Sequence, residues 1–310
     1  MSGRLVVVNP NAARVRDEGD RIQLTARLRS VLGRVDGASP QVVETADPSE
    51  VRPLVEAAVV RGAPGAVGVG GDGTLRDMAA ALVGTELALG VVPAGSGNQV
   101  ASALGIPRSM TRSVDALDGA RPRRLDLGSV TLTLADGTTA SSHFVIGCGA
   151  GFDARLMATT PAGWKRRVGQ LAYFGQALRL VGQLDAMPYR ITIDGEVIET
   201  DATIALVGNM GQLIPGSIGP RLGLDPADGL LDLIVVAARN PVEGVRGLAD
   251  QMWRTRTGGW SGSTSIRLRG RHIAIEPGRA EPLEVDGDHV GEGSLEARVE
   301  PGAIQLLVPG

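Results

Sequence analysis

Apolar and polar positions in the first third of the chain alternate between two spacings. Short continuous apolar runs, typical of buried strands, occur at Arg4–Asn9, Gln41–Thr45, Ala66–Val69 and Ala88–Val92. Segments with helical spacing follow these runs, at Asp20–Leu32, Pro48–Arg61, Leu75–Val83 and Gln99–Leu104. Strands that alternate with helices predict a parallel sheet in a three-layered α/β domain. Ligands of such sheets bind beyond the carboxyl ends of the strands.

The pattern changes after about residue 122. The runs Val130–Leu134 and Ala140–Ile146 flank Asp136-Gly137, and the runs Tyr189–Ile193 and Val197–Ile204 flank Asp194-Gly195. Both dipeptides favour tight β-hairpin turns. Further strands are expected at Ser265–Leu268, His272–Ile275, Leu283–Val285, Leu295–Val299 and Ile304–Val308, and helices at Trp164–Gly182 and Pro241–Arg254. The second part of the chain is therefore expected to be antiparallel.

Length and composition agree with two globular domains. The 310 residues exceed what one hydrophobic core usually holds, and 43% hydrophobic with 21% charged residues is typical of a folded protein. A formal net charge of -3 and an aromatic content of 3% exclude nucleic acid as an expected partner. The chain has neither a general positive field nor enough aromatic rings to stack on bases.

No apolar stretch is long enough for a signal peptide or a membrane span. The N-terminal run Leu5–Val8 stops at Asn9, whereas a membrane helix needs about 20 apolar residues. Cys148 is the single cysteine, which excludes an internal disulfide and fits a reducing compartment. We therefore expect a soluble, cytoplasmic protein.

Two glycine-rich segments each follow a predicted strand and precede a predicted helix. The first, Gly70-Gly71-Asp72-Gly73-Thr74, overlaps a GxGxxG spacing that starts at Gly68, so a dinucleotide site is one interpretation. Its Asp72 would repel a pyrophosphate unless a divalent cation or a substrate proton stood between them. The next strand also ends in Pro93, where a dinucleotide site would have an acidic residue. These features favour phosphoryl transfer.

The second segment is Ala94-Gly95-Ser96-Gly97-Asn98. Two such turns on neighbouring strands would line one pocket with backbone N–H groups and helix N-termini, which stabilise phosphate oxygens. Either turn alone could equally be a tight strand-to-helix connection. The pair, with a carboxylate inside it, predicts a nucleoside triphosphate site.

The motifs Gly70 to Thr74 and Pro93 to Asn98 resemble the catalytic domain of the diacylglycerol kinase, sphingosine kinase and bacterial lipid kinase family. The resemblance continues along the chain at Asn9-Pro10, Leu104 to Pro107, Gly149 to Asp153, Asp225 to Asp232 and Val285 to Asp288. It implies an NAD-kinase-like α/β nucleotide domain, residues 1–122 plus about 291–310. A β-sandwich domain for the lipid, residues 123–290, would follow, with the C-terminal strands returning to the first domain.

The resemblance also implies an ATP-dependent lipid kinase that uses Mg²⁺ and phosphorylates the hydroxyl of a diacylglycerol-like lipid. The residues that would hold the nucleotide are Asn9, Thr45, Gly70, Gly71, Asp72, Gly73, Thr74, Gly95, Ser96, Gly97 and Asn98. Asp286 matches the general base, and Asp72 is the second acid with a catalytic role. The dipeptide Asp286-Gly287 by itself would indicate only another hairpin turn.

A structural magnesium is implied as well. Asp228 matches its aspartate ligand, with main-chain carbonyl groups near Asp225 and Leu230, and Asp72 and Asp288 match carboxylates linked to the ion through water. One direct carboxylate with carbonyls and waters suits magnesium. Several places depart from the family pattern: Asn11–Arg14 replaces a small residue and a glycine, Gln99 replaces an aspartate, and Asp77 and Asp288 stand where glutamates are frequent.

The implied partner is a membrane lipid, reached by transient peripheral contact with the inner face of the membrane, and family members are often homodimers. Lys165–Arg167 beside Trp164 could dock on anionic lipid or form a solvated helix start. Two other functions stay open. One is a kinase of a small soluble hydroxyl compound or dinucleotide, because NAD kinases share the Gly70–Thr74 loop. The other is a nucleotide-binding regulatory protein without turnover.

Overall fold

The structure is a computed structural model of the chain and describes residues 2–151, 186–211, 224–236, 243 and 265–310. It has two compact units. The N-terminal unit comprises Met1–Leu127 and Gly302–Gly310, and the C-terminal unit comprises Gly128–Pro301. No helix in the described part of the chain is long and apolar enough to cross a membrane. The helix predicted at Trp164–Gly182, and nearly all of the one at Pro241–Arg254, lie outside the described residues.

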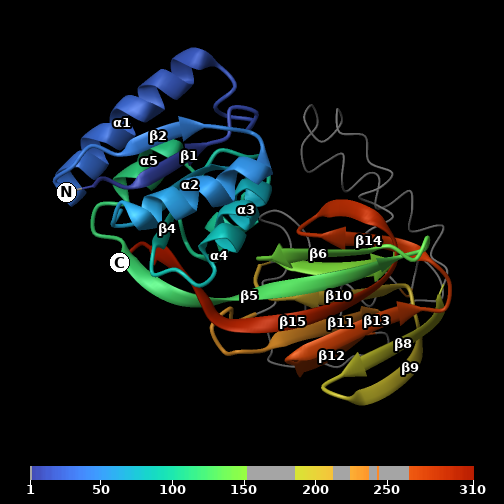
Figure 1. The fold of residues 1–310 in the computed structure, drawn as a ribbon. Coiled ribbons are helices and arrows are strands. Elements are labelled where there is room, and N and C mark those ends of the chain that lie inside the picture. The colour runs from blue at the N-terminus through green and yellow to red at the C-terminus, as the bar shows by residue number, and fades with distance from the viewer. Residues whose placement is uncertain (1, 152–185, 212–223, 237–242, 244–264) are drawn as a thin grey trace. The chain divides into compact units, whose positions relative to one another are not determined.

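A parallel sheet forms the centre of the N-terminal unit, as the alternating pattern predicts (Figure 1). Its strands are β1 (Leu5–Val8), β2 (Gln41–Glu44), β3 (Ala66–Gly70) and β4 (Ala88–Pro93), in the order β2-β1-β3-β4. The end of β15 (Asp288–Val308) lies parallel to β4, with Gln305 and Leu306 paired to Ala88 and Leu89. The end of the chain therefore returns to the first sheet, as the family resemblance implies.

Helices cover both faces of this sheet. They are α1 (Glu18–Asp36), α2 (Pro48–Val60), α3 (Asp72–Leu82), α4 (Gln99–Ala103) and α5 (Met110–Asp115). α1 and α5 contact each other, and Leu28 of α1 is buried together with Val6 of β1 and Val67 of β3. α2 and α3 contact each other, and Leu75 of α3 lies against Gly68. Neighbouring strand residues point to opposite faces. α1, on the side of Val67, and α3, on the side of Gly68, therefore cover opposite faces of the sheet.

The C-terminal unit is an antiparallel sandwich (Figure 1). One layer runs β12 (Ser265–Gly270), β11 (Leu231–Val236), β10 (Ile204–Gly208), β7 (Gly147–Gly151), β14 (Glu281–Val285). The other runs β9 (Glu196–Ala202), β8 (Met187–Ile193), β13 (His272–Pro277), β15, β5 (Arg121–Leu134), β6 (Thr139–Phe144). β15 pairs first with β14 and then with β13, so it joins the two layers.

Alternate side chains from both layers form the core of the C-terminal unit. Its buried members include Tyr189, Ile191, Ile273 and Ile275 from one layer and Val207, Leu231, Leu233 and Leu283 from the other. This period of two is what an antiparallel sheet with one buried face requires. The hairpin prediction for this half of the chain is confirmed.

Two strand predictions differ from the structure. Val197–Ile204 is split into β9 and β10, because the N–H and the hydroxyl of Thr203 both donate to the carbonyl of Val236, at 2.8 and 2.9 Å. The two strands expected between residues 295 and 308 are one strand, β15. The units divide after Leu127 and before Gly302, where the sequence suggested about 122 and 291.

Candidate active site

Two glycine turns lie against each other at the carboxyl ends of β3 and β4. The N–H groups of Ala94 and Gly95 both donate to the carbonyl of Gly70, at 2.8 and 3.2 Å. The two backbones are so close that a Cβ atom on Gly95 would lie 2.5 Å from the Cα of Gly71. A side chain at Gly95 would therefore push the turns apart. The two sequence motifs form one structural feature.

Asn98 and Asp72 fix the shape of the second turn. Asn98 has a left-handed backbone with φ 54°, and its buried amide bonds to Gly95 twice: Oδ1 accepts the N–H at 2.9 Å, and Nδ2 donates to the carbonyl at 2.7 Å. Oδ1 of Asp72 accepts the N–H of Val100 at 3.1 Å, at the start of α4. A carboxylate from the first turn thus holds the helix that follows the second.

Burial raises the pKa of Asp72 above its ordinary value, and hydrogen bonds from the backbone N–H groups of residues 98–100 lower it in part. The charged form of this carboxylate is therefore poorly solvated, and a nearby cation would stabilise it. Beside it, Gln99 has a buried Oε1 atom that has no hydrogen-bond partner among the described residues. This acceptor stands where the family resemblance has an aspartate.

Asn9, directly after β1, joins the first turn. Its Nδ2 donates to Oγ1 of Thr74 at 3.0 Å, and its Oδ1 accepts the N–H of Asn11 at 2.9 Å. Arg14, in the segment that departs from the family pattern, donates its N–H to the carbonyl of Ala94 at 3.0 Å. The departing segment is therefore bonded to the second turn.

α3 begins in the first turn without a capping side chain, because its N-cap residue is Gly71. By contrast, Asp17 and Asp47 cap α1 and α2 through their carboxylates. An N-terminus without a side-chain cap leaves N–H groups that can bind an anion. Ser96 and Gly97 of the second turn are exposed, so solvent reaches this end of the sheet.

Thr45 has structural partners. Its hydroxyl donates to the carboxylate of Glu50 at 2.5 Å and accepts the N–H of Asp47 at 3.0 Å. Asp47 caps α2 by accepting the N–H of Ser49 at 2.9 Å. Thr45 thus supports the start of α2, and its contact with a nucleotide stays a prediction.

Asp286 lies in the two-residue turn between β14 and β15, with φ 50° at Asp286 and 82° at Gly287. Its Oδ2 accepts the N–H of Val145 at 3.0 Å, and its Oδ1 accepts those of Ile146 and Gly147 at 2.8 and 3.1 Å. The N–H of Asp286 in turn donates to the carbonyl of Gly147 at 2.8 Å. The connection between β6 and β7 therefore fixes the predicted base.

Sequence reasoning misses two buried groups beside Asp286. Glu284 is 4% exposed, and its Oε2 accepts the N–H of Gly287 at 2.7 Å. Cys148 is fully buried, and burial raises the pKa of its thiol well above the ordinary value, with the charges of Glu284 and Asp286 adding to the rise. The available signal for Glu284 is its spacing from Asp286, because residues two apart in a strand share one face. Cys148 has no such signal, since it lies on β7 and pairs with Val285.

The residues predicted to hold a structural magnesium are divided between the units. Asp72 belongs to the N-terminal unit, whereas Asp225, Asp228, Leu230 and Asp288 belong to the C-terminal unit. Among the described residues, no three His, Cys, Asp or Glu side chains form a metal-binding group.

Asp228 already has partners for both of its carboxylate oxygens. Oδ1 accepts the N–H of Leu230 at 3.0 Å, and Oδ2 accepts a hydrogen bond from Nη2 of Arg269. A carboxylate paired with a guanidinium does not fit the role of a magnesium ligand, because the two cations would repel each other.

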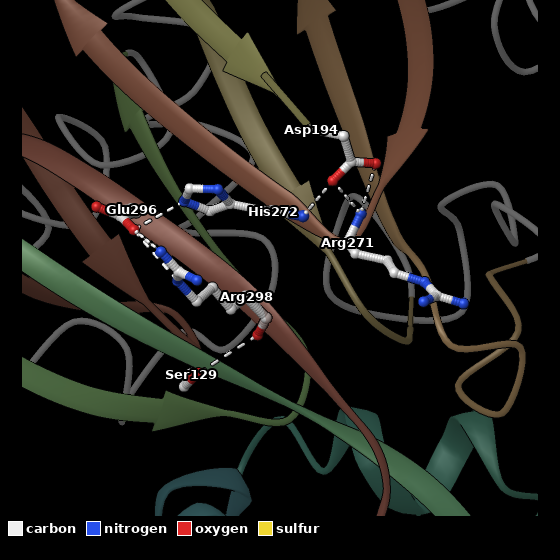
Figure 2. Close-up of polar contacts among 6 residues, drawn as sticks. All are labelled: Ser129, Asp194, Arg271, His272, Glu296 and Arg298. Carbon is white, nitrogen blue, oxygen red and sulfur yellow. Dashed lines mark hydrogen bonds and ion pairs between the residues drawn. The ribbon is translucent and has the colours of Figure 1, made fainter. Parts of the chain in front are cut away.

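A further polar group on the C-terminal unit has no predicted function (Figure 2). Asp194 lies in the turn between β8 and β9, and its carboxylate accepts the N–H groups of Arg271 and His272. Nearby, Glu296 accepts hydrogen bonds from Arg298 and contacts the ring of His272. Asp194 thus resembles Asp286, because each is the aspartate of an Asp-Gly turn and accepts backbone N–H groups.

Comparisons with known proteins agree along the chain. Residues 4–130 match the sequence model of the diacylglycerol kinase catalytic domain, and residues 147–308 match that of the YegS C-terminal NAD kinase beta sandwich-like domain. A Pseudomonas aeruginosa protein named "Probable lipid kinase YegS-like" is 30% identical over 282 residues, which cover 89% of this chain and 87% of that protein. A Mycobacterium tuberculosis protein named "Diacylglycerol kinase" is 27% identical, over 85% of this chain and 82% of its own.

Solved structures show the same fold. The crystal structure of a diacylglycerol kinase from Bacillus anthracis has a TM-score of 0.70 and 18% sequence identity to this chain. The match covers 99% of this chain and 96% of the other. The α/β domain followed by a β-sandwich, expected from the resemblance, is therefore confirmed.

Proposed function

Because the chain belongs to the family defined by the diacylglycerol kinase catalytic domain and the YegS C-terminal domain, we propose that it is an ATP-dependent lipid kinase. It transfers the γ-phosphoryl group of ATP to the hydroxyl of a diacylglycerol-like lipid. The observation that carries this proposal is the close pairing of the turns Gly70–Thr74 and Gly95–Asn98 at the start of α3.

The paired turns suit the phosphates of a nucleotide. The glycines leave the backbone open to a ligand, and the N-terminus of α3 supplies N–H groups and a positive dipole end. Asn9 holds Thr74 in place, and Asp72 and Asn98 hold the second turn. A magnesium ion carried with ATP would neutralise phosphate charge. It would also stabilise the ionised form of Asp72, whose pKa burial raises.

Asp286 is assigned as general base from the family resemblance. As the lipid hydroxyl attacks, its oxygen forms a bond to the γ-phosphorus, and the bond from that phosphorus to the β–γ bridging oxygen breaks. The hydroxyl proton passes to a carboxylate oxygen of Asp286, and the products are ADP and the phosphorylated lipid. The three N–H groups of residues 145–147 orient that carboxylate.

A lipid acceptor requires contact with a membrane surface. We propose transient, peripheral contact, in keeping with the relative named as a lipid kinase. The candidate docking patch Lys165–Arg167 lies outside the described residues. A dimeric state is a further expectation, and sedimentation of the purified protein would test it.

The function is tested with purified protein, labelled ATP, magnesium and an acceptor panel in mixed micelles. The panel contains diacylglycerol, a sphingoid base, phosphatidylglycerol and, as the soluble alternative, NAD. Label in a lipid product, absent with Asp286→Asn, supports the proposal. Label in NAD would instead support the dinucleotide kinase, which the NAD-kinase-like description of the C-terminal domain favours as the second candidate.

A chain that binds ATP without labelling any acceptor would be a regulatory protein. Calorimetric titration with ATP and magnesium separates this outcome from a failure to bind. No heat on titration would contradict the assignment of the glycine turns.

A further inference from the structure

Four side chains on and beside β11 and β12 form a charge cluster, which we call the Asp228 cluster: Asp228, Asp232, Arg267 and Arg269. Arg267 donates from Nε to Oδ1 of Asp232 at 2.5 Å, and both side chains are almost fully buried, with 7% and 3% exposure. Nε of Arg269 lies 3.3 Å from the same Oδ1. Arg269 therefore bridges Asp232 and Asp228.

The fold places Arg269 in the cluster. β11 and β12 are antiparallel, and Asp232 pairs directly with Arg269 in the register. Side chains of directly opposite residues lie on the same face of a sheet, so the guanidinium is held beside the aspartates by the backbone. Asp228 is oriented separately, because its Oδ1 accepts the N–H of Leu230 across a turn with Gly229 at φ 73°.

Among the four side chains of the Asp228 cluster, all in the described part of the chain, the charges balance without a metal ion. Two carboxylates carry two negative charges, and two guanidinium groups carry two positive charges. Arg267 pairs with the buried Asp232, and Arg269 contacts both Asp232 and Asp228. Because an arginine does not lose its proton in a protein, a divalent ion at Asp228 would meet a permanent positive charge.

We infer that in this chain the guanidinium of Arg269 takes the place of a divalent cation at Asp228. The family resemblance implies a structural magnesium there, and this chain instead closes the same turn with an internal cation. The C-terminal unit then needs no divalent ion at Asp228 and binds none there. A magnesium ion that enters the N-terminal unit with ATP would bind independently of Asp228.

The test is a titration of the nucleotide-free, full-length protein with Mn²⁺, followed by the loss of the electron paramagnetic resonance signal of the free ion. Wild type and Asp228→Asn should bind Mn²⁺ equally. Arg269→Gln, which keeps hydrogen-bond donors but loses the charge, should gain a Mn²⁺ site, and Arg269→Gln/Asp228→Asn should lose it again. Arg190→Gln is the matched control, because Arg190 is also an exposed strand arginine, 3.3 Å from Glu199. It should gain no site.

Two outcomes overturn the inference. One is a Mn²⁺ site in the wild type that disappears in Asp228→Asn, which would mean that the cluster opens to admit a metal ion. The other is a folded Arg269→Gln that gains no site. Should Arg269→Gln not fold, wild type against Asp228→Asn still decides the first point.

Thermal unfolding adds a second readout, since magnesium should raise the melting temperature of Arg269→Gln and leave the melting temperature of the wild type unchanged. Neither readout depends on kinase activity.

Discussion

Two hairpins of the C-terminal unit use the same dipeptide in the same way. In each, an Asp-Gly pair forms a two-residue turn with positive φ at both positions: 50° and 82° at Asp286-Gly287, and 49° and 92° at Asp194-Gly195. In each, the carboxylate accepts backbone N–H groups from a neighbouring connection: residues 145–147 for Asp286, and Arg271 with His272 for Asp194 (Figure 2).

The two turns differ in what surrounds them. Asp194 is exposed and lies near the exposed ion pairs of Glu296, whereas Asp286 is partly buried beside the buried Glu284 and Cys148. Geometry of the turn alone therefore does not make a base, because the same geometry occurs at a site without predicted chemistry. The comparison shows that a carboxylate in an Asp-Gly turn acts first as a structural tie, and that its environment must supply any catalytic role.

The sharpest test of this comparison is a pair of matched substitutions. Asp286→Asn should lower lipid phosphorylation by about 10²- to 10⁴-fold, the usual contribution of a general base, while ATP binding stays close to normal. Asp194→Asn removes the same charge from the same kind of turn and should leave turnover unchanged. Both should destabilise the protein by a similar amount, about 1 to 2 kcal/mol, because an amide oxygen replaces a charged acceptor. Micelle assays and urea unfolding measure the two effects. Full activity of Asp286→Asn would remove this residue from the base role.

The next effect concerns Asp72, a third carboxylate that accepts backbone N–H groups, in the N-terminal unit. Asp72→Asn keeps an oxygen for the N–H of Val100 but removes the charge. We expect activity to fall by about 10- to 100-fold, as for the loss of one contact to a charged group, with a rise in the KM for ATP. Stability should not fall, because the buried charge is gone. A variant with wild-type magnesium and ATP dependence would contradict this role.

The turn backbones give a smaller, purely conformational effect. Gly287→Ala and Gly195→Ala each place a side chain at a left-handed φ, 82° and 92°, and should each destabilise the protein by about 1 to 2 kcal/mol. Of the two, Gly287→Ala alone should also reduce activity, because it displaces Asp286. Equal effects of both on turnover would mean that activity follows overall stability rather than the position of the base.

Local features of the fold are predictable from the sequence, and long-range ones are less so. Strands β1 and β3 are buried throughout and β4 nearly so, and their apolar runs locate them to within about two residues; β2 is partly exposed, yet its run Gln41–Thr45 locates it equally well. Pro301-Gly302 instead misleads, since it indicates a turn within β15. In the structure the N–H of Gly302 donates to the buried carboxylate of Asp126 at 2.8 Å, so the strand continues past the proline.

The same division applies to the site. The glycine turns carry their own signal, because close backbone contact requires glycine at Gly95. The tie between Asp286 and residues 145–147 joins positions 139 to 141 apart in the chain, and the pair of Asp228 and Arg269 spans 41. No local pattern encodes such contacts, so a general base had to come from family resemblance, and the arginine at Asp228 could not be foreseen.

The smallest effect lies beside Asp194 and concerns pH. A hydrogen bond from Arg298 lowers the pKa of Glu296, with a further contribution from His272, against the opposing effect of burial. The ionised form is thus favoured in the folded state. It stabilises the protein above the ordinary value of 4.5, and this contribution is lost as the pH falls through the lower folded value. Because the Glu296 side chain is 42% exposed, solvent screening keeps the contribution small.

Glu296→Gln should therefore lower the thermal midpoint slightly at neutral pH and flatten its decline on the acid side of 4.5. Glu199→Gln is the control, since Glu199 is 73% exposed and lies 3.3 Å from Arg190, so its loss should change the profile less. Turnover should be unaffected in both variants, because the Asp194 hairpin has no predicted catalytic role. Parallel acid-side profiles for wild type and Glu296→Gln would show that the ion pairs of Glu296 add no stability. The backbone hydrogen bonds of Asp194 would then be what stabilises this hairpin.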